Sequence, residues 1–403
     1  MLMIWNMVER FLPIIIQFSA YIVITREVPP EDVGVVGVIS LFIALSQVVI
    51  DGGMSTLVIR DQGRDRKLLS TVHYCSIFIS IVLCALLALL SPVIENYLQI
   101  NNLSRYLCFS LIVLPIAGSA VVSRSLMIIN GRYKMMTLLA LISSVVSFTI
   151  SYFLFAKGLG IWSVITLSLV FNGLNSLLII RYSKFNSGKY FEFELISKHA
   201  LYIIKLLTTN LIDNLFRNIY PLIIAKYLNV YSAGIFTQSQ KITELPSYNL
   251  YAVIYRFSLS KFSSVESLQN KKAEIIKYIF LVMSFSVVVY LLGYCYSLEV
   301  IVFLMGDKWV NMSNVFSYLL LSGLIFPLKA MVNAFLCTIG SAGSVLCLEI
   351  FNKSLLVINI VFSIYFGFEI ELMALGVLVS SFITVILMVI IVIKAISRQG
   401  EYN

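Results

Sequence analysis

The chain has 403 residues, of which 60% are hydrophobic and 12% are charged, and its mean hydropathy is +0.95. Soluble domains carry about 25% charged residues, so this composition excludes an ordinary soluble protein. The formal net charge of +9 is explained below by membrane topology, and nucleic-acid binding is therefore not expected.

Long apolar runs follow one another along the chain. A membrane-crossing helix needs roughly 20 mostly apolar residues, whereas a porin strand has about 10 residues of alternating pattern. The first run continues without a small-residue cleavage site, which favours a retained anchor over a signal peptide. The sequence therefore predicts an all-α polytopic membrane protein with about twelve transmembrane helices, at 3–25, 34–58, 71–94, 106–129, 135–156, 161–180, 200–225, 230–256, 275–304, 313–338, 343–366 and 371–394.

The basic residues between these spans indicate how the chain lies in the membrane. If the N-terminus is cytoplasmic, most Lys and Arg residues outside the spans fall on the cytoplasmic side. This bias follows the positive-inside rule, so both termini are expected to be cytoplasmic. The outer loops then hold few basic residues, which are Arg26, Arg105, Lys157, Lys226 and Lys308.

The two halves of the chain resemble each other. The inner loop 181–199 separates six spans from six, and both halves begin on the same side of the membrane. The stretch IVITREVPPEDVGVVG near the outer end of the first span aligns with LIIAKYLNVYSAGIFT near that of the seventh, so that Gly34 matches Gly234. Repeats of this kind are common in transporters, whose substrate binds between the repeats. We expect an N-terminal six-helix lobe at 1–199, which includes the inner loop, and a C-terminal six-helix lobe at 200–403.

Charged residues inside the predicted spans indicate a polar interior. A charge that faces lipid is costly, so such residues usually face the bundle interior or a water-filled cavity. Cations outnumber acids here, which favours an anionic substrate in a central cavity between the lobes. The candidate substrate-binding residues are Arg10, Arg124, Arg217, Lys241, Lys329 and Lys353, and the candidates for ion coupling are Asp213, Glu244, Glu349 and Asp51.

Two structural interpretations of these charges stay open. Asp213 with Arg217, and Glu349 with Lys353, have the i,i+4 spacing of ion pairs on one helix. Residues close to the span ends are able to snorkel to the membrane interface; these are Arg10, Lys205 and Asp51.

No metal or cofactor is expected. The six cysteines lie within or at the ends of spans and form no C-x-x-C pair, so we expect them to pack as small apolar residues. Metal-ligand clusters, a P-loop and a nucleotide-binding fingerprint do not appear in the sequence.

Short motifs in both halves resemble those of one transporter family. The first half contains WNMVERF (5–11), PPEDVGVVG (29–37) and DGGMSTLVIR (51–60), and the second contains FRNIYPLIIAKYL (216–228), AGIFTQSQKITELP (233–246) and MGDKWVNMSNVFSYLLLSG (305–323). In this order they resemble the bacterial lipid-linked oligosaccharide flippases. These are the O-antigen and exopolysaccharide exporters of the multidrug/oligosaccharidyl-lipid/polysaccharide superfamily.

The resemblance implies a fold and a function. It implies twelve spans in two lobes around a central cavity in the bacterial inner membrane. The protein would move undecaprenyl-diphosphate-linked sugar repeat units to the periplasmic leaflet by alternating access, driven by H+ or Na+. The implied partners are a polyprenyl-diphosphate-linked oligosaccharide, the lipid bilayer and other polysaccharide-assembly proteins.

The resemblance also places individual residues. Arg217 is expected to bind the diphosphate, with Asp213 neutralising it in the empty cavity. Relatives often have an acid where this chain has Tyr220, so Asp213 is a candidate to replace it. Pro221 is interpreted as a hinge, with a static kink as the alternative. The family's paired motifs fall on Glu9 and Arg10, on Arg217 and Asn218, and on Lys241, Glu244 and Pro246, and the candidates for stacking on sugar rings are Tyr220, Tyr248, Tyr251 and Tyr255.

Two other functions stay open at this point. A drug/cation antiporter of the same superfamily would share the fold, but a cavity for cations should favour acids over bases. A membrane-embedded polysaccharide polymerase would be an enzyme, and it would be expected to carry a large outer catalytic loop or an inner nucleotide-sugar domain. The sequence predicts neither, so we expect a transporter and not an enzyme.

Overall fold

The computed structural model describes residues 2–188, 190–263, 268–339 and 342–400. Within these ranges, the side chains of 2–11, 14, 193, 245, 246, 249, 260, 268–274, 342 and 393–400 are not described. The described residues form helices and connecting loops, without a strand. They divide into two compact units, Met1–Gly234 and Ile235–Asn403.

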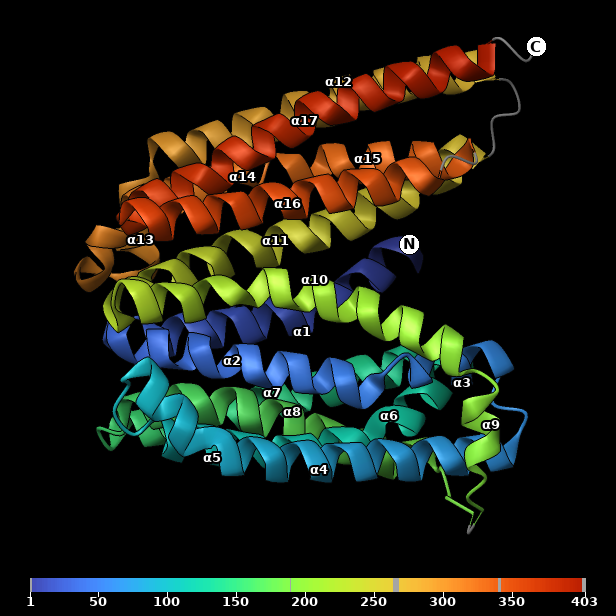
Figure 1. Ribbon diagram of the computed structural model, residues 1–403, viewed down its shortest axis with the longest axis vertical. Coiled ribbons are helices and arrows are strands. Elements are labelled where there is room, and N and C mark those ends of the chain that lie inside the picture. The colour runs from blue at the N-terminus through green and yellow to red at the C-terminus, as the bar shows by residue number, and fades with distance from the viewer. Residues whose placement is uncertain (1, 189, 264–267, 340–341, 401–403) are drawn as a thin grey trace. The chain divides into compact units, whose positions relative to one another are not determined.

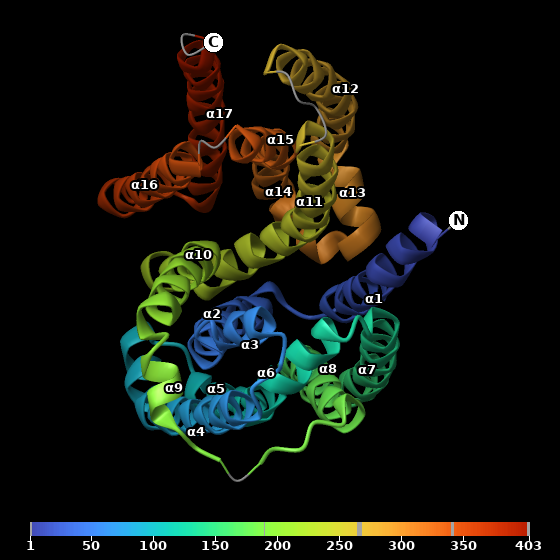
Figure 2. The same cartoon turned by 90° about the vertical axis from the view of Figure 1, so that its right-hand side faces the viewer.

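The first unit contains ten helices and the start of an eleventh. They are α1 (Leu2–Thr25), α2 (Pro30–Asp51), α3 (Met54–Asp61), α4 (Arg66–Leu98), α5 (Leu103–Leu111), α6 (Val113–Ile129), α7 (Tyr133–Ala156), α8 (Gly160–Ser183), α9 (Phe193–Ser197), α10 (Ala200–Tyr227) and the beginning of α11 (Val230–Ser263). Figure 1 shows the long helices of this unit side by side. Figure 2 shows them nearly end-on, with α2 enclosed by α10, α4, α6 and α8, all of which it contacts.

The second unit continues α11 and adds seven further elements. They are α12 (Leu268–Cys295), α13 (Ser297–Met305), the short 3-10 helix η1 (Asp307–Met312), α14 (Ser313–Ser322), α15 (Ile325–Thr338), α16 (Ala342–Phe366) and α17 (Ile370–Gly400). Helix α17 packs against α14, α15 and α16. The core of this unit includes Phe262, Phe335 and Met388, which are all fully buried.

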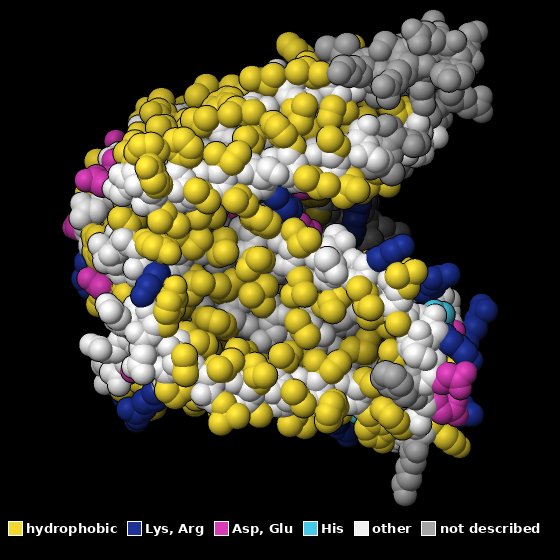
Figure 3. All heavy atoms as spheres, in the orientation of Figure 1, with side chains coloured by type: hydrophobic (Ala, Val, Ile, Leu, Met, Phe, Trp, Pro, Cys, Tyr) yellow, Lys and Arg dark blue, Asp and Glu magenta, His cyan; other side chains and the backbone are white. Residues whose placement is uncertain are grey.

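The described helices account for every predicted span. Nine segments are long and apolar enough to cross a membrane: Pro30–Asp61, Arg66–Leu98, Leu103–Ile129, Tyr133–Ala156, Gly160–Ser183, Ile275–Cys295, Asp307–Thr338, Gly343–Phe366 and Ile370–Val392. The remaining three predicted spans coincide with α1, α10 and α11. With 28 residues, α10 is long enough to cross a membrane, but it carries polar residues along its middle. Space-filling atoms in Figure 3 show hydrophobic side chains covering the flank of the first unit and charged ones near the helix ends, as lipid contact requires.

Local sequence explains where α2 begins and ends. Pro30 occupies the first turn, where its missing N–H costs no hydrogen bond, and Glu31 and Asp32 complement the helix dipole there. At the other end, Gly52 and Gly53 adopt positive φ angles of 50° and 79°, which glycine adopts without strain. The span predicted at 34–58 is therefore broken into α2 and α3.

The matching glycines of the two sequence repeats meet in the first unit. A Cβ atom built on Gly34 would overlap the carbonyl oxygen of Val230, and one built on Gly234 would overlap that of Pro30. The backbones of α2 and α11 are therefore in direct contact at this crossing, as small residues permit in membrane helices. The boundary of the compact units lies just beyond Gly234; the six-helix lobes divided at 199/200 stay a prediction about the repeats.

The loop that follows α8 is attached to α4. Lys67 Nζ lies 2.5 Å from a carboxylate oxygen of Glu192, whose backbone N–H donates to Thr71 Oγ1 at 3.1 Å. The Tyr74 hydroxyl donates to the carbonyl of Gly188 at 3.2 Å. These contacts hold the connection between the predicted lobes against the first unit.

Candidate functional site

The candidate residues are distributed over both compact units. Asp51, Arg124, Asp213 and Arg217 belong to the first unit, and Lys241, Glu244, Lys329, Glu349 and Lys353 belong to the second. The side chain of Arg10 lies outside the described residues. Their gathering around one central cavity stays a prediction, and each unit is described by itself.

In the first unit, two of the candidates, Asp213 and Arg217, lie on one polar face of α10. We define the polar face of α10 as Asn210, Asp213, Asn214, Arg217 and Asn218, which recur at spacings of three and four residues and so share one side of the helix. Asp213, Arg217 and Asn210 are exposed, and the other two are half-buried. Residues of this kind are expensive in lipid and normally face a water-filled space or other protein.

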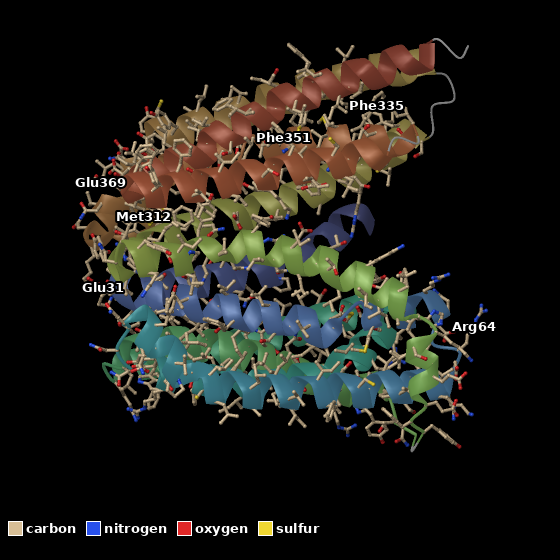
Figure 4. The ribbon with its side chains drawn as sticks, viewed as in Figure 1. Glu31, Arg64, Met312, Phe335, Phe351 and Glu369 are labelled. Carbon is tan, nitrogen blue, oxygen red and sulfur yellow. The ribbon has the colours of Figure 1, made fainter. Side chains whose placement is uncertain are left out.

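The same side of α10 is packed at both of its ends. Toward the N-terminal end of α10, a Cβ atom on Gly53 would lie 3.0 Å from Cβ of Leu206, so α10 and the α2–α3 turn touch. Toward its C-terminal end, Tyr220, Pro221 and Ile224 are buried. Exposure is thus confined to the polar middle of this face. Figure 4 shows Arg64 and Glu31 at opposite ends of the unit, with the middle of α10 between those two levels.

The asparagines of the polar face hydrogen-bond to their own helix. The amide Nδ2 of Asn214 donates to the carbonyl of Asn210 at 2.9 Å, and that of Asn218 donates to the carbonyl of Asn214 at 2.9 Å. Asp213 and Arg217 were predicted as site residues from the sequence, and the three asparagines were not predicted as a set. Their spacing of four residues in TNLIDNLFRN was the available signal.

Asp51 and Arg124 form a second charged group in the first unit. They lie close enough for their charges to attract each other, Asp51 at the end of α2 and Arg124 on α6. Asp51 is half-buried and Arg124 is exposed. The proximity of a cation favours an internal role for Asp51 over snorkelling, and sequence analysis had not paired the two.

In the second unit an ion pair joins α15 to α16. Lys329 Nζ lies 2.8 Å from one carboxylate oxygen of Glu349 and 2.9 Å from the other, and the side chains are only 16% and 31% exposed. Spacing along one helix does not reveal a pair of this kind. The predicted i,i+4 pairs, Glu349 with Lys353 and Asp213 with Arg217, stay predictions.

Polar and aromatic side chains of α11 lie beside this ion pair. The ring of Tyr251 stacks on that of Tyr255, with centroids 5.9 Å apart and planes at 7°. Asn333 Nδ2 donates to the Tyr251 hydroxyl oxygen at 3.3 Å, and the Tyr255 hydroxyl lies 3.9 Å from Cys337 Sγ. Tyr251 is also close enough to Glu349 for an electrostatic interaction with its carboxylate.

The other residues singled out in the sequence lie elsewhere or are buried. The ring of Tyr220 is 3% exposed and presents no face to a sugar. Tyr248 packs against Phe326, with centroids 5.1 Å apart. On α11, Glu244 accepts a hydrogen bond from Gln240 Nε2 at 2.8 Å. Gln240 directly precedes Lys241 in the sequence. Among the described residues, no group of three or more His, Cys, Asp or Glu side chains is arranged to hold a metal ion.

Comparisons with known proteins agree with this fold. The family model described as polysaccharide biosynthesis protein matches residues 23–314. No curated protein matches the chain in sequence. The lipid II flippase MurJ, in an inward closed conformation, has a TM-score of 0.77 at 16% identity and covers 98% of this chain and 89% of that one.

Multidrug transporters have the same fold. An inward-facing MATE family transporter of the MOP superfamily has a TM-score of 0.73 at 15% identity and covers 98% of this chain and 99% of its own. A MOP superfamily transporter from Pyrococcus furiosus, described as having a binding pocket of reverse polarity, has a TM-score of 0.62 at 17% identity, with coverage of 97% and 95%. The all-α membrane fold predicted from the sequence and the resemblance to this superfamily are therefore confirmed.

Proposed function

The chain belongs to the polysaccharide biosynthesis protein family, and we propose that it is a flippase for polyprenyl-diphosphate-linked oligosaccharides. It moves them from the cytoplasmic to the periplasmic leaflet of a bacterial inner membrane, with both of its termini in the cytoplasm. The observation that carries this proposal is Arg217, an exposed cation at the middle of a helix long enough to cross a membrane. Such a cation is costly unless it serves an internal partner or a substrate.

The charge suits a diphosphate for a physical reason. Moving an ionised phosphate out of water is costly, and the cost falls when a cation forms charge-assisted hydrogen bonds to it. The guanidinium groups of Arg217 and Arg124 are able to make two parallel bonds each to phosphate oxygens. In the second unit, Lys329 and Lys353 supply point charges of the same sign. The polyprenyl chain stays in lipid, alongside the exposed apolar flanks of the helices.

Ion coupling is assigned to Glu349 in this proposal. Its carboxylate lies 2.8 Å from Lys329 Nζ. Binding of H+ or Na+ to the carboxylate would weaken that pair and release Lys329 to the diphosphate. Glu349 is chosen among the acidic candidates because its ion pair joins two different helices, α15 and α16. Asp51 is near Arg124.

The test is a flipping assay in proteoliposomes. Vesicles contain a fluorescent undecaprenyl-diphosphate oligosaccharide, and a membrane-impermeant quencher reports how much of it reaches the outer leaflet. The protein should speed this transfer over protein-free vesicles, and Arg217→Ala should abolish the gain. Arg105→Ala is the matched control, because Arg105 lies in the first turn of α5 with its guanidinium over the ring of Trp162. No acceleration by the unaltered protein would contradict the proposal, and export of a cationic dye instead would favour a drug antiporter.

A further inference from the structure

We propose that the polar face of α10 is a track for sugar hydroxyl groups, in which Asn210, Asn214 and Asn218 bind the sugars next to the diphosphate. This inference rests on the proposed function and extends it from the charged group to the neutral part of the substrate. The role proposed for Asp213 and Arg217 does not account for the three asparagines on the same helix, and the sugar contacts do.

The orientation of the amides carries the first step. One N–H of Asn214 and one N–H of Asn218 are used by the backbone carbonyls one turn earlier, both at 2.9 Å. These bonds fix each side chain against the helix and leave the carboxamide oxygen and the second N–H for other partners. The side chain of Asn210 makes no hydrogen bond within the described part of the chain and is exposed. A hydroxyl group both donates and accepts, so each amide matches one sugar hydroxyl.

The spacing of the amides carries the second step. Four residues of helix rise about 6 Å, so the three side chains form a row about 12 Å long. A row of neutral donor and acceptor groups suits a chain of sugar rings, which offers hydroxyl groups at every ring. Arg217 lies one residue before Asn218 and three after Asn214, so a diphosphate bound there places the first sugar against the amides.

Other asparagines in the protein show what a structural role looks like. Asn352 Oδ1 accepts from Thr384 Oγ1 at 3.3 Å, from α16 to α17, and Asn359 Nδ2 donates to the carbonyl of Met373 at 3.1 Å. Such bonds join membrane helices to each other. The bonds of Asn214 and Asn218 join α10 only to itself and satisfy one N–H of each amide, and the row of three amides still offers three carboxamide oxygens and further N–H groups. A polar ligand or water in the exposed middle of this face satisfies them.

The test compares two lipids on the purified protein in nanodiscs. Undecaprenyl diphosphate is one probe, and the same lipid carrying a neutral oligosaccharide is the other; the ratio of their dissociation constants is the readout. For the unaltered protein we expect the sugar-bearing lipid to bind at least tenfold more tightly, since each hydrogen bond formed is typically worth roughly a factor of two to ten. Asn210→Leu, Asn214→Leu and Asn218→Leu together should bring that ratio close to one.

Two controls keep the result interpretable. Asn172→Leu removes the same type of local bond, from Nδ2 to the carbonyl of Ser168 at 2.8 Å on α8, and should leave the ratio unchanged. Asn210→Leu alone breaks no hydrogen bond within the described protein, so it should fold normally and lower the ratio about threefold.

The outcomes separate this inference from the proposed function. Binding of neither lipid by the unaltered protein would overturn the proposed function itself. Binding of both lipids with equal affinity, or a ratio that survives in the triple variant, would overturn the sugar track and leave the diphosphate function standing. An equal loss of affinity for both lipids in Asn210→Leu would also overturn it, because the amide would then support Arg217 instead of a sugar.

Discussion

Lys329 on α15 and Glu349 on α16 form an ion pair in which the ammonium nitrogen lies 2.8 Å and 2.9 Å from the two carboxylate oxygens. Both side chains are largely shielded from solvent. Removing one member of a shielded pair leaves the other charge without compensation, whereas removing both is often tolerated. Comparing single and double substitutions of Lys329 and Glu349 therefore distinguishes a structural pair from a coupling element.

If the pair is a coupling element, Glu349→Gln should abolish gradient-driven accumulation of substrate, because the amide cannot release a proton or bind Na+ as a carboxylate does. Exchange of substrate across the membrane should remain measurable. Accumulation and exchange are compared in the same vesicles, with Glu299→Gln on the exposed part of α13 as the control. A double variant, Lys329→Ala with Glu349→Ala, that recovers full accumulation would show that the pair is only structural.

Arg217 allows a similar separation of roles. Arg217→Ala should leave the protein in the membrane but stop assembly of surface polysaccharide. Arg217→Lys should retain part of the activity, because the lysine ammonium keeps the positive charge but not the two parallel hydrogen bonds of the planar guanidinium. Glycan staining is normalised to the amount of protein in the membrane. Restoration by Asp213→Ala in the Arg217→Ala background would mean that Arg217 only balances an acid.

The crossing of α2 and α11 predicts a steric effect. Gly34→Leu or Gly234→Leu should destabilise the protein by more than about 3 kcal/mol, because the new side chain meets backbone atoms that are unable to move aside. Gly173→Ala on α8 is the control, because its Cβ would meet only Ile116 Cδ1 at 3.9 Å and a helical alanine is favoured over glycine. Thermal unfolding in detergent measures both, and similar midpoints for Gly34→Leu and the unaltered protein would contradict the close crossing.

Membrane orientation is tested by reporter fusions. Fusions after Lys67, Lys189 and Lys272 should report the cytoplasm, and fusions after Asn102 and Lys308 should report the periplasm, because the basic residues are expected to stay inside. Alkaline phosphatase and green fluorescent protein give opposite signals at each site. A periplasmic signal at Lys189 would exclude the scheme of six spans before this loop and six after it.

Much of the fold follows from local sequence, and less of the site does. Span positions depend on the length of apolar runs, which is a local property, so each predicted span coincides with one or two helices. The break at Gly52 depends on backbone angles, and the pairing of Lys329 with Glu349 depends on which helices are neighbours. The repeat pattern matched Gly34 to Gly234, but their direct contact required three-dimensional information. The asparagines of α10 recur at every fourth residue of the sequence, but a neutral amide in a membrane helix indicates a binding site less clearly than a charge does, and only Asn218 was predicted, through the resemblance.

The polar face of α10 also has a consequence for how the protein is made. On the scale that describes insertion by the translocon, a charged residue at the helix centre costs about 2.5–3.5 kcal/mol, and a leucine or isoleucine contributes only about 0.3–0.6 kcal/mol in return. Asp213 and Arg217 both lie in the middle of α10, so this helix is a poor candidate for entering the bilayer alone. Its packing partner α2 is synthesised earlier in the chain. Biogenesis should therefore depend on α10 leaving the translocon against helices that are already in place, so that insertion of the second half of the protein depends on the first half.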